Sequence, residues 1–255
     1  MAKVTRRYFL FSSAALSVGC AMRRSDVAQR DVSSPTVRPP AVGQSWRYAK
    51  QDIYTRTLVD DEIDHVAAVG RTVDIDSRSE AVKPSNAEGK WGTAWLRKYI
   101  PHRELTDGPL PSEIQAPWGL VLVDPHWAQV QVYESPIPLW PEKLAPGWRT
   151  HFSTKYKTPS NENGLLWDQT MTAHGWESIT VAAGQFRALR FTNMVNFKSP
   201  DFSRENSQRK ETLWFAPEVG RWVARESMGS YYIEESSVDT PYDEPWFRWE
   251  LIEWT

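Results

Sequence analysis

The sequence predicts an all-β domain with a minor α contribution: a curved antiparallel sheet, half-barrel or barrel-like, with long loops and one candidate short helix. Several segments alternate apolar and polar residues with the period of two that is typical of a strand buried on one face. Short connections that contain glycine or proline separate these segments, as in hairpins. Regular helical spacing is otherwise missing, which favours a sheet closed or half-closed on itself.

The first expected strands form an up-and-down pair. Residues 46–58 are rich in aromatic and β-branched side chains, which favour a strand. The acidic residues 60–62 are expected to form a polar turn. Residues 63–76 then form the returning strand, because their last four residues alternate strictly between apolar and acidic side chains.

The middle of the chain has a weaker pattern. Residues 89–99 place their large apolar side chains near helical spacing, which predicts the short helix. The proline-rich residues 101–117 are expected to form a loop. Two strands follow at residues 118–123 and 128–133, and residues 136–141 are expected to form a connector because they contain three prolines.

Strand signals are clearest after residue 146. The glycine of the 182–184 connection suits a hairpin position with positive φ. The connection 216–220 contains proline and glycine and therefore predicts a second tight turn. The expected strands are residues 165–181, 185–198, 211–215, 221–226, 230–238 and 247–254.

Two motifs of the C-terminal half resemble a pattern that recurs in bacterial envelope proteins. Residues 181–188 form a valine–small–Gly–x–Phe hairpin motif, and residues 212–223 contain a Trp-Phe-Ala-Pro-x-x-Gly motif. Over residues 147–235 the chain therefore resembles the LolA/LolB-like half-barrels. The resemblance implies a curved antiparallel sheet whose concave face binds a lipid-like ligand. Residues 77–145 have no counterpart in that family, and the shared motifs concern turns and core positions more than function.

The first 19 residues are expected to be an export signal. A short basic head precedes an apolar run that is too short to span a bilayer, and a small-residue site follows it. Arg6 and Arg7, one residue before a Phe-Leu pair, resemble the twin-arginine signal of bacteria. An ordinary Sec signal that carries two arginines is the alternative.

Residues 16–20 resemble a bacterial lipobox, in which Cys20 is lipidated and becomes the mature N-terminus. Ser17 departs from the leucine that is commonest there, and plain cleavage after Ala21 is the alternative. Lipidation is favoured because Cys20 is the only cysteine of the chain and has no disulfide partner within it. An alanine after the cysteine resembles an outer-membrane address. We therefore expect a periplasm-facing protein of the cell envelope, anchored to the outer membrane.

The chain after the signal divides into a tether and a β domain. Residues 20–44 lack periodicity and contain several prolines and serines, so they are expected to form a flexible tether. Residues 45–255 form the β domain. The start of the 146–255 segment briefly echoes the start of the 45–140 segment, which suggests two related halves as a variant of this organisation.

Charge and composition exclude some partners. Three of the 30 basic residues and no acidic residue lie in the signal, so the remaining chain carries 27 basic against 32 acidic residues, a formal net charge of −5. A mildly acidic chain without a basic block argues against nucleic acid as a partner. The expected contact with the membrane is therefore the N-terminal lipid.

No catalytic signature is evident in the sequence. A Gly-x-Ser-x-Gly motif and a Gly-rich phosphate loop are both missing, and Cys20 belongs to the signal. A weak calcium site at the acidic residues 60–65 is an alternative to a solvated hairpin tip. The histidines show no metal-binding spacing, so we expect neither a metal nor a cofactor; they are His65, His102, His126, His151 and His174.

The 14 tryptophans are the unusual feature of the composition. They could form an aromatic ligand-binding face or fill the core of a β structure. We expect a non-catalytic envelope lipoprotein that binds an apolar or amphipathic ligand, or a protein partner. The alternative is a glycan-binding or glycan-cleaving periplasmic protein. The candidate ligand-binding residues, for which core packing is the competing role, are Trp148, Trp167, Trp176, Trp214 and Trp222.

Overall fold

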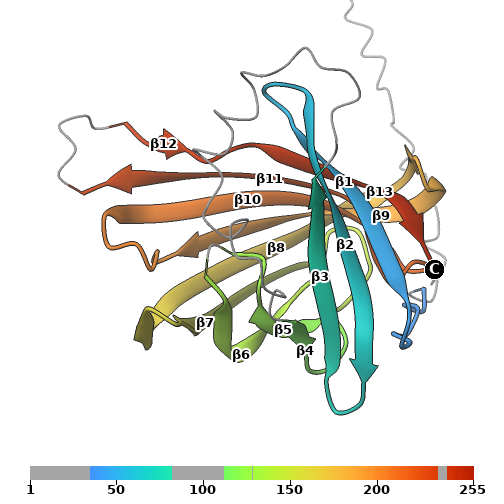
Figure 1. The fold of residues 1–255 in the computed structure, drawn as a ribbon, viewed down its shortest axis with the longest axis horizontal. Helices are drawn as coiled ribbons and strands as arrows, with labels where there is room; N and C mark the ends of the chain where they lie inside the picture. Colours follow the sequence, from blue (N-terminus) through green and yellow to red (C-terminus); the bar gives the residue numbers. More distant parts are fainter. Residues whose placement is uncertain (1–34, 82–111, 128, 235–239) are drawn as a thin grey trace, which may run out of the picture. The chain divides into compact units, whose positions relative to one another are not determined.

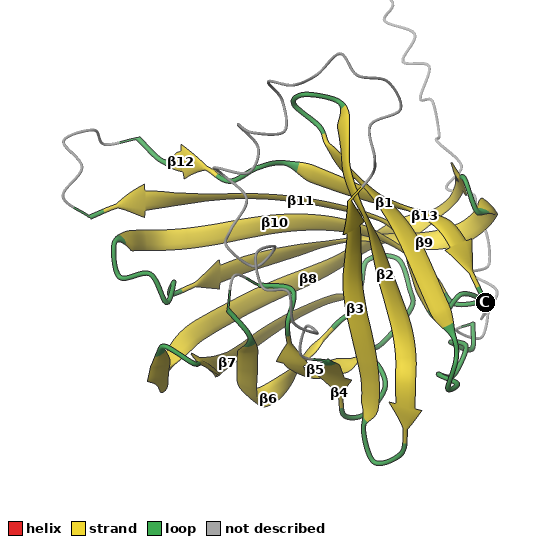
Figure 2. Cartoon of the chain, viewed as in Figure 1, coloured by secondary structure: helices red, strands yellow, loops and turns green. Residues whose placement is uncertain are grey.

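The structure, a computed structural model, describes residues 35–81, 112–127, 129–234 and 240–255 of the 255-residue chain. These residues contain strands and turns but no helix (Figures 1 and 2). The strands are β1 (Ser45–Asp52), β2 (Thr57–Val69), β3 (Val73–Ala81), β4 (Glu113–Gln115), β5 (Leu120–Asp124), β6 (Gln131–Pro138), β7 (Arg149–Thr158), β8 (Asn161–Val181), β9 (Gly184–Phe197), β10 (Arg204–Ala216), β11 (Arg221–Ile233), β12 (Tyr242–Asp243) and β13 (Phe247–Trp254).

The strands form one antiparallel sheet that closes into a barrel. Neighbours in the sequence pair in order from β1 to β10, and β13 joins β1 to β11. The long pairing of β10 with β11 closes the ring, while the short β12 adds to β11 only (Figure 1). The predicted all-β, barrel-like fold is therefore confirmed. The described part of the chain contains no helix long and apolar enough to span a membrane.

Among the described residues, buried side chains form two clusters. The larger cluster includes Trp46, Tyr48 and Trp222, and the rings of Tyr48 and Trp222 stack with centroids 3.8 Å apart. The smaller cluster surrounds Trp167, which lies edge-on to Tyr133 with ring centroids 5.2 Å apart. Large aromatic side chains thus fill much of the interior, as flat rings pack well between the walls of a sheet.

The two tight connections of the C-terminal half occur where the sequence predicts them. Gly184 adopts a φ of 135° at the β8–β9 hairpin, and Gly220 adopts a φ of 74° after β10. A Cβ atom on Gly220 would lie 2.8 Å from the carbonyl oxygen of Arg38. Position 220 therefore requires glycine for two reasons: its backbone is left-handed, and another segment approaches it closely.

The predicted polar turn at residues 60–62 is wrong, because these residues lie in the middle of β2. The turn between β1 and β2 lies at residues 53–56, where the Thr55 amide donates to the Asp52 carboxylate (3.0 Å). Asp61 forms an ion pair with Arg47 at 2.6 Å. Acidic side chains with such partners are compatible with a strand, and their composition alone made them resemble a turn.

Other boundaries also differ from the predictions. The expected connector 136–141 begins inside β6, and the expected loop 101–117 contains β4 in its described part. The expected helix at residues 89–99 lies outside the described residues, as do the export signal, Cys20 and most of the tether.

The last residues of the expected tether lie against the barrel. The Arg38 amide donates to the Pro217 carbonyl oxygen (2.8 Å), and the Trp118 indole donates to the Arg38 carbonyl oxygen (3.2 Å). Val37 packs against the larger core cluster. The segment that precedes β1 is therefore attached to the barrel beside the β10–β11 turn.

Candidate functional site

A small cavity lies inside the barrel, between the two core clusters. Its volume is about 60 Å³, enough for a few water molecules or one small ligand. One part of its wall is apolar, with Leu213 and Trp222 from the larger cluster and Ile137 and Trp167 from the smaller one. The rest of the wall is polar or charged and includes Glu62, Glu113, Asp124, His126, Asn193, Glu211, Arg221 and Arg225.

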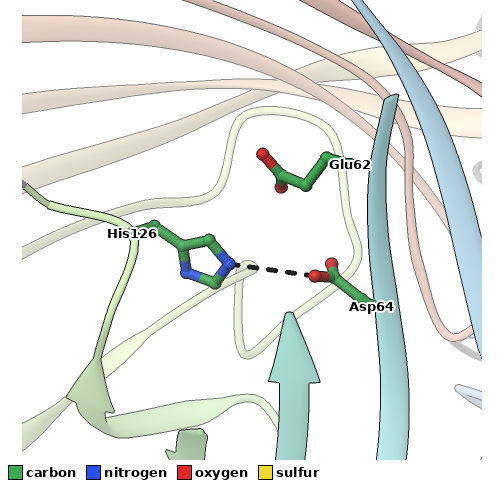
Figure 3. A group of neighbouring side chains, drawn as sticks. All are labelled: Glu62, Asp64 and His126. Carbon is green, nitrogen blue, oxygen red and sulfur yellow. Dashed lines mark ion pairs between the residues drawn. The ribbon is translucent and has the colours of Figure 1, made fainter. Parts of the chain in front are cut away.

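Glu62 and Asp64 come from the same strand, β2. They lie two residues apart, so their side chains face the same side of the sheet. Asp64 is fully buried. His126 comes from the connection after β5, where the carboxylate of Asp124 accepts a hydrogen bond from the His126 amide (2.8 Å). Figure 3 shows the His126 ring facing Asp64, with Glu62 beside it.

Buried ions of both signs meet at this place. An Arg221 Nη2 atom lies 2.8 Å from Asp64 Oδ2 and 3.4 Å from Glu113 Oε2. His126 Nδ1 lies 2.8 Å from Asp124 Oδ1 and 3.5 Å from Glu113 Oε2, and His126 Nε2 lies 3.8 Å from Asp64 Oδ1. Each buried charge therefore has an opposite charge nearby, which offsets the cost of removing it from water.

The ionisation of this cluster follows from its contacts. Burial lowers the pKa of His126, but the hydrogen bonds to Asp124 and Asp64 outweigh burial and raise that pKa to about 10. Burial raises the pKa of Asp64, yet the charge of Arg221 and the His126 contact hold it below its usual range. His126 is therefore a cation and Asp64 an anion at neutral pH.

Several buried polar atoms of the cavity wall have no hydrogen-bond partner in the described protein. They are Nε and Nη1 of Arg221, Nε of Arg225 and Oδ1 of Asn193. The Arg221 residue is only 3% exposed. An unpaired buried donor or acceptor is costly: the three arginine nitrogens lack an acceptor, and the Asn193 oxygen lacks a donor.

The formal charges around the cavity do not cancel. Three cations, His126, Arg221 and Arg225, face five carboxylates, those of Glu62, Asp64, Glu113, Asp124 and Glu211. The formal net charge is therefore −2 with His126 protonated. A cluster with this sign favours a cation as an additional occupant.

Glu62, Asp64 and His126 form a group that could hold a metal ion. One potential ligand atom from each lies within 4.8 Å of the others. Carboxylate oxygen and imidazole nitrogen are ordinary ligands of divalent transition metals. The weak calcium site considered for residues 60–65 is different, because alternate residues of a strand face opposite sides of the sheet. Asp61 pairs with Arg47 and His65 is exposed, so neither joins this group.

The structure brings together two of the five candidate tryptophans. Trp167 and Trp222 line the cavity and are 3% and 6% exposed. Trp148, Trp176 and Trp214 lie outside it, half-buried against the larger core cluster. The Trp214 indole donates to Glu177 (3.1 Å), for example. The ligand-binding role of these residues stays a prediction.

The charged cluster is absent from the expectations drawn from the sequence. The alternation of Glu62 and Asp64 along a strand indicates that both share one face, and this was the available signal. His126 and Arg221 carried no comparable signal, because Arg221 lies 157 positions from Asp64 in the chain. Only the closure of the barrel places them together.

No protein-family model and no curated protein matches this chain. One similar solved structure is a candidate lipoprotein from Parabacteroides distasonis, with 15% identity and a TM-score of 0.47 over 87% of this chain and 100% of that chain. Another is a candidate exported protein with a YmcC-like fold from Bacteroides fragilis, with 11% identity and a TM-score of 0.49 over 86% and 99%.

Proposed function

We propose that this chain is an exported, lipid-anchored protein of the bacterial cell envelope that binds a small polar ligand inside its barrel without catalysing a reaction. One observation carries the ligand-binding part. Arg221 is buried in the cavity wall, and its Nε and Nη1 atoms have no partner in the described protein. Such atoms favour a cavity that is occupied by a group with hydrogen-bond acceptors.

The cavity supports a small polar ligand better than the apolar or amphipathic ligand expected from the sequence. A volume of about 60 Å³ is well below the roughly 300 Å³ at which sites for larger ligands begin. Arg221 and Glu113, both nearly fully buried, form part of the wall. An acyl chain would therefore leave charged groups without partners, and a sugar ring is too large for this volume.

The envelope location is supported by the N-terminal sequence. An export signal precedes Cys20, and a segment rich in proline and serine separates Cys20 from the barrel. We place the barrel on the periplasmic side of the outer membrane, with Arg6 and Arg7 directing twin-arginine export. This route delivers the barrel already folded, which suits a sheet with many contacts between distant residues.

Native mass spectrometry tests the ligand. The mature protein, purified from its own host envelope under native conditions, is expected to carry an added mass of a small polar molecule or ion. That mass should disappear on denaturation, because folding creates the cavity. Protein with Arg78→Met, an exposed residue away from the cavity wall, is expected to keep the added mass. A wild-type spectrum with the bare protein mass alone would contradict ligand binding.

Substitution of Cys20 tests the anchor. Cys20→Ala should move the protein from the membrane fraction to the soluble periplasmic fraction, because no lipid can be attached. Cell fractionation with immunoblotting measures the distribution. Ser17→Leu is the matched control, since it brings the segment closer to the common lipobox and should keep the protein at the membrane. Membrane association of the Cys20→Ala variant equal to wild type would refute the lipid anchor.

A further inference from the structure

We infer that one side of the cavity is a binding site for a divalent transition-metal ion, with Glu62 and His126 of the cavity wall and the fully buried Asp64 as its protein ligands. The inference rests on the proposed function, because it names the class of small polar ligand that the barrel takes. One potential ligand atom from each residue lies within 4.8 Å of the others, so a small shift would bring all three to one ion (Figure 3).

Each proposed ligand has a further partner, and in Asp64 and His126 this partner holds the atom that does not face the other ligand. The Trp249 indole donates to Glu62 Oε2 (3.2 Å), and Arg221 Nη2 donates to Asp64 Oδ2 (2.8 Å). Nδ1 of His126 lies 2.8 Å from the Asp124 carboxylate. Metal sites characteristically have such outer partners, which orient the ligands and, for histidine, select the nitrogen that binds.

The atoms that remain are suited to an ion. Oδ1 of Asp64 and Nε2 of His126 face each other at 3.8 Å. The Ser77 hydroxyl lies between the same two residues, at 2.6 Å from Asp64 Oδ1 and 3.1 Å from His126 Nε2. An ion would replace the contact between Ser77 and His126, while Ser77 keeps its bond to Asp64.

The charge of the cluster favours a doubly charged ion. The carboxylates of Glu62, Asp64, Glu113, Asp124 and Glu211 outnumber the guanidinium groups of Arg221 and Arg225 around the cavity. A divalent cation would therefore reduce the uncompensated negative charge in the barrel.

The unpartnered atoms of Arg221 are an independent observation that points to a ligand. Three protein ligands leave coordination positions for water or a small anion. Nε and Nη1 of Arg221 lack protein partners, and the same guanidinium contacts the proposed ligand Asp64 through Nη2. The imidazole ligand favours a transition metal such as Zn²⁺ over Mg²⁺ or Ca²⁺, and the two carboxylates also suit Mn²⁺.

Calorimetric titration of the lipid-free mature protein, stripped with EDTA, tests the site with Zn²⁺ and separately with Mn²⁺. One ion per chain is expected to bind. His126→Gln and Glu62→Gln should each weaken binding by more than about 100-fold, and Asp124→Asn by about 10- to 100-fold through its effect on His126. His151→Gln is the matched control, since His151 is exposed and is not part of the cavity wall, and this variant should bind the ion as wild type does.

Thermal unfolding without metal identifies variants that fail to fold. If His126→Gln fails to fold, Glu62→Gln is the informative variant, because glutamine has nearly the same size and shape as glutamate. Wild-type protein that binds neither ion, or that binds it equally after Glu62→Gln, would overturn the metal site. If host-purified protein then carries another small molecule, the proposed function stands without the metal. If it carries no ligand of any kind, both proposals fail.

Discussion

Arg221→Met should lower the free energy of unfolding by about 3–5 kcal/mol, the range for removal of one partner from a buried ion pair. Arg221 is 3% exposed and lies 2.8 Å from Asp64, which is fully buried, and 3.4 Å from Glu113. Methionine fills a similar volume but leaves both carboxylates with fewer opposite charges. Unfolding in urea, followed by tryptophan fluorescence, measures the change.

Arg78→Met is the matched control for this substitution. Arg78 is 71% exposed and lies 3.3 Å from Glu80, so its loss should change the free energy of unfolding by less than about 1 kcal/mol. The double variant with Asp64→Asn should recover part of the loss, because the buried anion is removed together with its cation. A loss below about 1 kcal/mol for Arg221→Met would show that the buried ion cluster adds little to stability.

Trp167→Ala is expected to destabilise the barrel by about 3–5 kcal/mol, because it removes a large side chain from a packed core. Trp167 is 3% exposed, and its ring lies 5.4 Å from that of Trp127 and 5.2 Å from that of Tyr133. Its indole also donates to the Gln169 side chain (3.0 Å), which would lose its donor. The same unfolding assay in urea measures the effect.

Leu166→Ala is the control from the neighbouring position. Leu166 is 63% exposed because successive residues of a strand face opposite sides, so its truncation should cost less than about 0.5 kcal/mol. The pair also separates the two roles considered for Trp167. If Trp167→Ala is as stable as wild type but loses the added ligand mass in native mass spectrometry, Trp167 contacts the ligand and does not stabilise the core.

Much of the barrel is predictable from short-range patterns. Alternation predicts the strands of the C-terminal half, and the chemistry of glycine and proline predicts the turns at residues 182–184 and 216–220. The same reasoning fails at residues 60–62, where three successive acidic residues resemble a turn. Arg47 on the adjacent strand pairs with Asp61, and this contact depends on strand register rather than on local composition.

Less of the candidate site than of the barrel could be predicted from the sequence. The alternation of Glu62 and Asp64 indicates a shared face, and the abundance of tryptophan indicates an aromatic-rich interior. The sequence contained no sign that His126 faces Asp64. The residues next to His126 in the chain are typical of an ordinary polar connection between strands. Of the candidate tryptophans, Trp167 and Trp222 line the cavity, and the sequence did not distinguish them from the other three.

The all-β class and the hairpins follow from the sequence alone, because strand alternation and turn propensity act over a few neighbouring residues. The tertiary structure decided that the ring closes and that its interior is charged. The pairing of β10 with β11 closes the ring, and Arg221 meets Asp64 across 157 positions of the chain. Contacts over such separations depend on the register of every strand between them, which no local pattern encodes.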